Sequence, residues 1–252
     1  MNSILLEILK VSKINLTDMT LRTISGISLQ QNIFNISPKD FLRFAKEDLK
    51  ERDERGLINS ITNSKRAIDC QIDETIEKLI SKSDNFNPIV DDFLKYFEFE
   101  SDIPIKLRIV HALNLAPSLL ISKSRTLRNK LEHFYKKPEI KEVKEALDVA
   151  DLFIRSVTGK LGMIWEEFEI VDWKNNELNF KFSEKKFKIV YKKDDNLINT
   201  YLIDSNNIEY YGLLRLMLSS DDEIEIEETF KILLQQIKHP ISIENVKLYQ
   251  GD

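Results

Sequence analysis

The chain has little cysteine, histidine, glycine or proline, and each shortage excludes a class of protein. Cys70 is the only cysteine among 252 residues, so an internal disulfide is impossible and a cysteine-based zinc site is not expected. The three histidines, His111, His133 and His239, lie far apart in the sequence, which argues against a zinc enzyme. Six glycines and six prolines are too few for a collagen, a low-complexity linker or a loop-rich disulfide scaffold.

Long hydrophobic runs are also missing. No stretch approaches the roughly 20 apolar residues that span a bilayer. The apolar start of the chain is interrupted by Glu7 and Lys10 and lacks a basic region, so it is unlike a signal peptide. We therefore expect a cytoplasmic protein with no membrane partner. With 37 basic and 42 acidic side chains, the net charge of −5 does not favour nucleic-acid binding, which would need a local basic patch.

The hydrophobic pattern changes near residue 160. Before it, apolar residues recur at helical intervals, and after it short stretches alternate between apolar and polar residues. Thr158–Gly162 contains two of the six glycines and is the predicted boundary. We therefore predict an α+β protein, with an all-α helical bundle over residues 1–160 followed by a small antiparallel α+β domain of unknown role over residues 161–252.

Several helices have clear signals in the first part. Ser37 can cap a helix whose first position is Pro38, with Asp40 three residues after the cap. After Gly56 the apolar spacing predicts a long helix. Further helices are expected over residues 93–97 and 105–113, from Pro117 onward, and over residues 143–154. A tight corner at residues 136–138 would make the last two pack antiparallel, as in a bundle.

The second part carries short alternating segments. Strands are expected over residues 168–170, 178–182, 187–191 and 199–203, followed by a helix over 225–237 and a closing extension over 241–248. Trp165 and Trp173 flank the first strand and are expected in the core.

The segment Arg128-Asn-Lys-Leu-Glu-His133 has the residue types for RNA cleavage. On a helix, Asn129 and His133 share one face, and Arg128 lies about 140° around from His133, from where its long side chain can swing back. A histidine can take a proton from a ribose 2′-OH or give one to the leaving 5′-oxygen. An arginine can grip the phosphate through two hydrogen bonds, and Asn129 can orient the histidine or bind a phosphate oxygen.

Basic residues surround this segment. Between Ser122 and Lys137 there are six basic residues and one acid, Glu132, so the strip is predicted to attract phosphate. Tyr135 can stack on a base. The predicted substrate-binding residues are Lys123, Arg125, Lys130, Tyr135 and Lys136.

Simpler interpretations stay open for these and for other residues. Arg128 can pair with Glu132 one helical turn away, leaving His133 as an ordinary surface histidine. His111 is expected at the edge of the core, and His239 at a helix end, where a cation suits the helix dipole. The acidic run over residues 221–228 is expected to be solvated carboxylates at the start of a helix, not a metal site.

The segment from Arg128 to His133, continuing Phe134-Tyr-Lys-Lys-Pro138 and followed by an amphipathic helix, resembles the signature of HEPN-domain proteins. Those are helical bundles with an Arg-x(4–6)-His motif. Residues 56–73 also resemble an earlier helix of part of that superfamily. The resemblance covers roughly residues 40–157 and does not extend into the second part of the chain.

The resemblance implies a metal-independent endoribonuclease, commonly a toxin or host-defence effector. It implies a homodimer in which two motif helices face each other and share the site. Carried over, Arg128 and His133 are the catalytic pair and Asn129 the supporting polar group, with RNA as substrate, no cofactor, and an antitoxin or other regulatory protein as a candidate partner. Two alternatives remain: an inactive HEPN module that binds RNA or a protein, and a structural or sensor protein that acts through its second domain.

Overall fold

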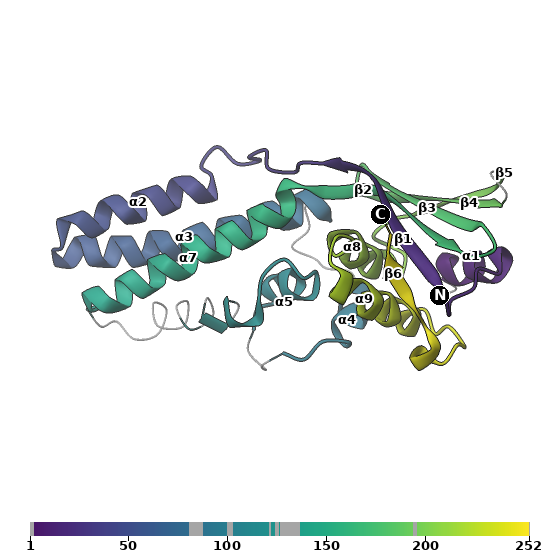
Figure 1. Ribbon diagram of the computed structural model, residues 1–252. Helices are drawn as coiled ribbons and strands as arrows, with labels where there is room; N and C mark the ends of the chain where they lie inside the picture. Colours follow the sequence, from purple (N-terminus) through teal and green to yellow (C-terminus); the bar gives the residue numbers. More distant parts are fainter. Residues whose placement is uncertain are drawn as a thin grey trace. The chain divides into compact units, whose positions relative to one another are not determined.

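Two compact units divide the chain, and neither is one continuous stretch of sequence. The structure is a computed structural model that describes residues 3–80, 88–99, 103–120, 122–123, 126, 137–193 and 196–251. Unit 1 comprises Met1–Ser28, Leu79–Glu98 and Met163–Asp252, and unit 2 comprises Leu29–Lys78 and Phe99–Gly162. The elements of both units are labelled in Figure 1.

Unit 1 is built on a six-stranded sheet with the order β5-β4-β3-β2-β1-β6. Neighbouring strands from β5 through β1 are antiparallel, whereas β6 is parallel to β1. The sheet is therefore mixed, and the predicted purely antiparallel arrangement is wrong at the β6 edge. The strands are β1 (Met19–Ile27), β2 (Ile164–Asp172), β3 (Asn176–Ser183), β4 (Lys186–Lys193), β5 (Asn196–Ile203) and β6 (Leu248–Gln250).

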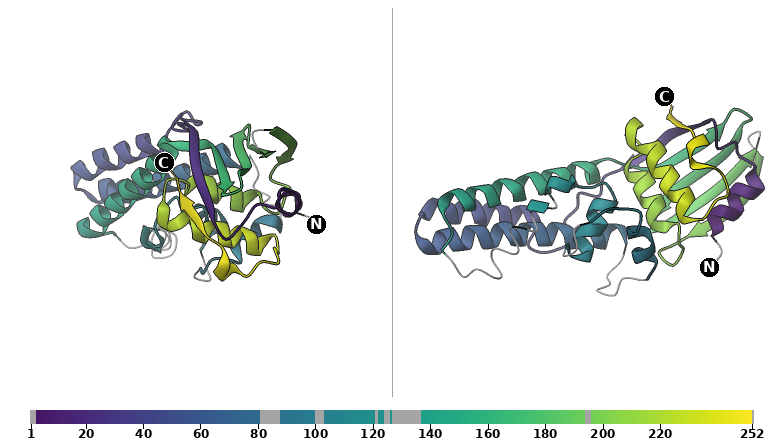
Figure 2. Two further views of the ribbon diagram at one scale, coloured as in Figure 1. Left: turned by 45° about the vertical axis from the view of Figure 1, so that its right-hand side comes forward. Right: turned by 90° about the horizontal axis from the view of Figure 1, so that it is seen from below.

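Helices cover one face of this sheet. Alternate residues of the strands point to that face and are almost fully buried, among them Leu21, Phe168, Phe180 and Phe187. Figure 1 and Figure 2 show α8 and α9 on this side, and Tyr210 of α8 meets Phe187 edge to face at 5.9 Å. The helices of unit 1 are α1 (Ile4–Ser12), α4 (Pro88–Leu94), α8 (Tyr210–Leu218), α9 (Glu223–Gln236) and the short 3-10 helix η1 (Ile243–Asn245).

The observed division differs from the predicted domains. Strand β1 lies within the range predicted as a helical domain, yet it pairs with β2, with Leu21 opposite Ile170. Residues 1–28 and 79–98 therefore belong with the sheet instead of the helices. The predicted boundary near residue 160 does coincide with one crossing between the units, because α7 ends at Gly162 and unit 1 resumes at Met163.

Unit 2 is helical. Its elements are α2 (Pro38–Glu51), α3 (Glu54–Leu79, of which residues 54–78 belong to unit 2), α5 (Ile105–Ala112) and α7 (Ile140–Gly162); residues 118–120, 122–123 and 126 are helical as well. The apolar residues whose helical spacing predicts these two helices are buried on α3 (Ile61, Ile68, Ile72, Ile76) and on α7 (Val143, Leu147, Ala150, Ile154). Ile58, at the same spacing on α3, is the exception and is 42% exposed. Both figures show α2, α3 and α7 side by side.

The prediction that Trp173 lies in the core is wrong. Trp173 is 66% exposed in the turn after β2, where the ammonium of Lys174 lies 4.8 Å from the ring centroid. The preceding residue explains this position: Asp172 accepts hydrogen bonds from the backbone N–H groups of Lys174 and Asn176, which closes the turn and leaves Trp173 at its tip. Trp165 is half-buried.

The start of α2 confirms the predicted cap. The Ser37 hydroxyl accepts from the Asp40 backbone N–H at 3.2 Å, and the Asp40 carboxylate accepts from the Ser37 backbone N–H at 3.0 Å. The Ser37 backbone N–H and, at 2.8 Å, the Ser37 hydroxyl both donate to this carboxylate and so lower the pKa of Asp40. The two bonds from backbone N–H groups satisfy two donors that the helix start otherwise leaves unpaired.

Replacing Ser37 with alanine is expected to lower the free energy of unfolding by about 1 kcal/mol, because one of these donors loses its partner. Urea unfolding followed by circular dichroism measures the change. Ser37→Gly is the matched control, with an expected loss of only a few tenths of a kcal/mol. Equal losses in the two variants would show that the cap does not stabilise α2.

Candidate functional site

Most of the predicted site lies outside the described residues. This applies to the catalytic candidates Arg128, Asn129 and His133, and to four of the predicted substrate-binding residues, namely Arg125, Lys130, Tyr135 and Lys136. Lys123 is the one member of the predicted set that the structure describes. The described residues that adjoin the motif in sequence are Thr126 before it and Lys137 after it.

The described neighbourhood of the motif rests on α3 and α7. A small cavity of about 40 Å³ lies between Ile61 of α3, Ala146 and Val149 of α7, and the side chains of Lys123 and Thr126. The Thr126 hydroxyl donates to the Ser122 carbonyl four residues earlier at 3.0 Å, as in a helix. This volume admits a few water molecules at most, so it is a gap between helices and too small for a nucleotide.

Lys123 already has a carboxylate partner. Its ammonium lies 2.7 Å from Glu145 of α7, and both side chains are about half exposed, at 48% and 52%. Glu142 of α7 lines the same cavity. The next described basic residue, Lys137, lies 3.3 Å from Glu54. Both described members of the basic strip are therefore paired with acids, and the local positive charge is lower than the count along the sequence predicted.

If the basic strip binds RNA, as its sequence predicts, neutralising Glu145 is expected to strengthen that binding. An exposed ion pair is worth at most about 1 kcal/mol, so Glu145→Gln, which frees Lys123 for phosphate, should raise RNA affinity by up to about fivefold at low salt. The measurement is fluorescence anisotropy with a labelled single-stranded RNA, made in a His133→Ala background to prevent cleavage.

Glu139→Gln is the control for this variant, since it removes the same charge near the start of α7 and Glu139 has no lysine partner among the described residues. If both variants change the affinity equally, Lys123 is not a phosphate contact.

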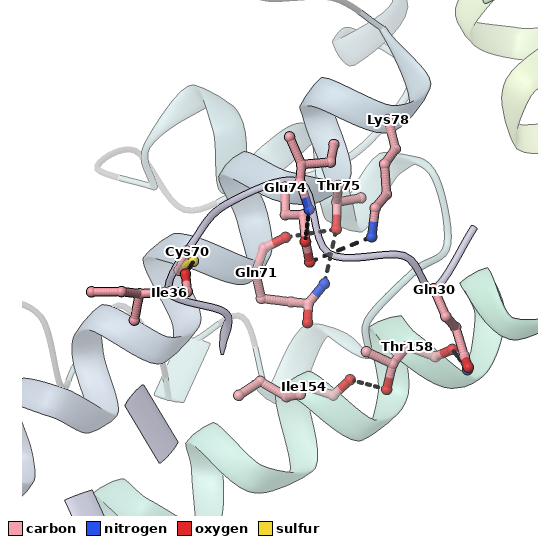
Figure 3. A network of polar contacts seen from close by, with 10 residues as sticks. Gln30, Ile36, Cys70, Gln71, Glu74, Thr75, Lys78, Ile154 and Thr158 are labelled. Atoms are coloured by element: carbon pink, nitrogen blue, oxygen red, sulfur yellow. Dashed lines mark hydrogen bonds and ion pairs between the residues drawn. The ribbon is translucent and has the colours of Figure 1, made fainter. Parts of the chain in front are cut away.

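A second polar cluster lies inside unit 2 (Figure 3). The Glu74 carboxylate accepts from the Ile33 backbone N–H at 2.8 Å and lies 3.4 Å from the Lys78 ammonium, with the two side chains only 4% and 8% exposed. Gln71 donates to the Thr75 hydroxyl at 3.3 Å, while its own side-chain oxygen is buried without a partner among the described residues. We therefore interpret this buried and hydrogen-bonded ion pair as a structural element of unit 2 and not as a catalytic site.

This cluster fixes the segment that leads into α2. The Leu29 backbone N–H donates to the Leu161 carbonyl at 2.8 Å, and the Gln30 amide donates to the Thr158 carbonyl at 3.0 Å. Farther along, the Cys70 thiol lies 3.6 Å from the Ile36 carbonyl (Figure 3). Burial, with nearby Glu74, raises the pKa of Cys70 to about 11, so the thiol stays protonated near neutral pH and is a poor nucleophile. The cavity beside the cluster measures about 20 Å³, close to the volume of one water molecule.

The other two histidines do not form a second site. His111 is half-buried, as predicted, with its ring 5.7 Å from that of Phe99 and its Nδ1 atom 3.5 Å from the Ala116 carbonyl. His239 follows α9, and burial together with the charge of Lys10 lowers its pKa. Its position just after α9 agrees with the predicted helix end, and the lowered pKa favours the neutral ring over the cation there.

The acidic run has the predicted structural role. Asp222 caps α9 by accepting from the backbone N–H groups of Ile224 and Glu225, and Glu225 lies 3.0 Å from Arg215. In the part of the chain that the structure describes, no group of three or more metal-ligating side chains is found. Over the same residues, no helix combines the length and apolar character that crossing a membrane requires.

Comparisons with family models, with curated proteins and with solved structures found no match to this chain.

Proposed function

We propose that the chain is a metal-independent endoribonuclease that cleaves RNA with Arg128 and His133. The observation that carries the proposal is the motif Arg128-Asn-x3-His133 inside a segment with six basic residues and one acid, within the helical unit. An imidazole and a guanidinium so close in sequence supply a proton carrier and a phosphate clamp, which together suffice when the substrate contains its own nucleophile.

The reaction needs no group beyond these side chains and the RNA. His133 takes the proton of a ribose 2′-OH, and the 2′-oxygen attacks the adjacent phosphorus. The bond from phosphorus to the 5′-oxygen breaks, and that oxygen takes up the proton from the His133 imidazolium, which returns to its neutral form. The products carry a 2′,3′-cyclic phosphate and a 5′-hydroxyl. Arg128 holds the non-bridging oxygens and offsets the charge that develops on them, while Asn129 orients the imidazole.

The next described helix after the motif in sequence is firmly packed. Helix α7 begins at Ile140, seven residues after His133, and is held by a buried stripe of Val143, Leu147, Ala150 and Ile154. Catalytic groups need such a support to keep their geometry. Since Lys123 and Lys137 are paired with acids, phosphate binding in this proposal depends on the cations of the motif itself more than on its flanks.

The proposal includes a homodimer with shared sites, a toxin or host-defence role in the cytoplasm, and an antitoxin or other regulatory protein as partner. The resemblance to HEPN-domain proteins supports these points. Within it, Arg128 of one subunit acts with His133 of the other, so that neither subunit is complete alone.

Incubation of RNA with the protein in excess chelator tests the proposal. We expect the native chain and the control His239→Ala to cleave, and His133→Ala to bind RNA without cleaving it. If the native chain binds RNA but leaves it intact, the chain is instead a binding module. Cleavage that stops when metal is removed would refute the metal-independent reaction.

A further inference from the structure

A cavity within unit 1 has no part in the proposed reaction. Its volume is about 600 Å³, within the roughly 300–1,000 Å³ typical of small-molecule sites. Its walls come from α1, α4, the residue Ile208 just before α8, and the C-terminal end of α9. Four elements distant in sequence thus converge on one space.

One stripe of helix α1, formed by Leu6, Glu7 and Lys10, lines this cavity. Ser3 also lines the cavity, and it caps the helix by accepting a hydrogen bond from the Leu6 backbone N–H. The opposite side of α1 is buried. The fully buried Glu209 carboxylate also accepts from the Leu5 backbone N–H at 2.9 Å. The stripe is therefore held in place and is not free to turn away from the cavity.

The cavity is lined by two acids, Glu7 and Asp92, and two lysines, Lys10 and Lys238. Asp92 is paired at 2.5 Å with Lys95, which is not part of the lining, and this leaves the two lysines facing one acid. Lys10 and Lys238 are exposed and form no ion pair within the described chain, and Glu7 is the one unpaired acid beside them. The backbone of Lys238 is left-handed (φ 55°), and its N–H donates to the Gln235 carbonyl, which closes the end of α9. Burial, and after it the charge of Lys10, lowers the pKa of the adjacent His239.

Apolar side chains form the rest of the surface. Leu6, Ile89, Ile208 and Ile237 line the cavity between the charged groups. A fully hydrophilic anion would leave these side chains in contact with water. A ligand with an aliphatic body covers them, and each Å² of apolar area removed from water stabilises the complex by about 25 cal/mol. A polyanion such as RNA fits this cavity poorly, because it carries more negative charge than two lysines can balance and is also repelled by Glu7.

We propose that this cavity binds a small amphiphilic anion, with one carboxylate or phosphate head between Lys10 and Lys238 and an aliphatic body on Leu6, Ile89, Ile208 and Ile237. The site lies wholly within unit 1 and does not depend on the proposed ribonuclease activity.

Isothermal titration calorimetry on the full chain tests the proposal with octanoate and octyl phosphate as probes. We expect at least one probe to bind with a dissociation constant in the range of about 0.01–1 mM, and acetate, octanol and octylammonium to bind at least about tenfold more weakly. The stronger of the two probes identifies the head group. Lys10→Gln and Lys238→Gln should each weaken binding by about three- to tenfold, and Glu7→Gln should strengthen it.

Lys186→Gln is the matched control, because Lys186 is an exposed lysine on β4 of the same unit and away from the cavity. It should leave binding unchanged. Equal binding of octanoate and octylammonium, or equal loss in the Lys186 control and the two cavity variants, would overturn the proposal. So would the absence of binding by either probe at about 10 mM. All four substitutions are at exposed side chains, so thermal unfolding should confirm intact folds.

Discussion

Replacing His133 with alanine is expected to lower the rate of RNA cleavage by about 10²–10⁴-fold, because proton transfer by a positioned side chain contributes that much to the rate. Binding of RNA should change little, since the imidazole acts on protons and not on the backbone charge. The measurement is single-turnover cleavage of a labelled RNA in excess chelator, with RNA affinity measured in parallel.

Arg128 is expected to behave differently under substitution. Arg128→Ala should lower both affinity and rate, and Arg128→Lys should recover affinity but little of the rate, because an ammonium keeps the charge and loses the two-point grip on the phosphate. The double variant with His133→Ala should be scarcely slower than the worse single variant, since the two groups act in one step. Independent, fully additive effects would contradict a shared reaction centre.

The shared site of the proposed dimer has its own signature. When Arg128→Ala and His133→Ala proteins are mixed, some dimers contain one subunit of each kind. If each site takes Arg128 from one subunit and His133 from the other, such a mixed dimer has one site in which both residues are intact. With random exchange, activity should return to about one quarter of the native value. If each subunit contains its own complete site, every site in the mixture is defective and no activity returns.

Glu74→Ala is expected to lower the free energy of unfolding by about 3–5 kcal/mol, the second large effect. Removing this carboxylate leaves the Lys78 ammonium, only 8% exposed, without its partner, and also leaves the Ile33 backbone N–H without an acceptor. Urea unfolding of the full chain measures the loss. The control is Glu77→Ala on the same helix, a half-buried acid with no partner among the described residues, for which less than about 1 kcal/mol is expected.

A double replacement separates the buried charge from the lost packing. Glu74→Leu with Lys78→Met removes both charges and keeps most of the volume, so it should cost less than Glu74→Ala alone. If Glu74→Ala costs no more than the Glu77 control, water reaches the pair and the segment from Leu29 to Ser37 is held by other contacts.

Local signals in the sequence predicted the elements whose partners are close in the chain. The capping box at Ser37 and the strands β2 to β5 were found because a helix start and a meander of hairpins depend on neighbouring residues. Strand β1 was missed because its partners β2 and β6 lie more than 130 residues farther along the chain. Its alternation, with Leu21 buried and Arg22 exposed, is visible only once those partners are known.

Helix α8 was missed for a different reason. All nine of its residues, Tyr210–Leu218, are buried, so it lacks the polar face whose period identifies a surface helix. Arg215 is part of this burial: it donates to Thr229, lies beside Glu225 and stacks 4.9 Å from the Phe97 ring centroid. Only the fold reveals the partners that allow this charged residue to be buried.

The candidate site could be predicted in its residue types but not in its electrostatics. The basic strip was counted along a contiguous stretch, whereas Glu145 meets Lys123 from 22 residues away, on the next helix. A count along the chain cannot include a carboxylate that folding brings in. The cavity of unit 1 could not be predicted for the same reason, because its two lysines, Lys10 and Lys238, are separated by almost the whole chain.

The central claim, that Arg128 and His133 use the ribose 2′-OH to break the chain, has a direct test. The protein is incubated in excess chelator with an RNA and with the same sequence in which every 2′-OH is replaced by hydrogen, and the product ends are identified by mass spectrometry. We expect the protein to cleave the RNA to 2′,3′-cyclic phosphate and 5′-hydroxyl ends and to leave the deoxy strand intact. Cleavage of both strands, or products with 5′-phosphate ends, would contradict it.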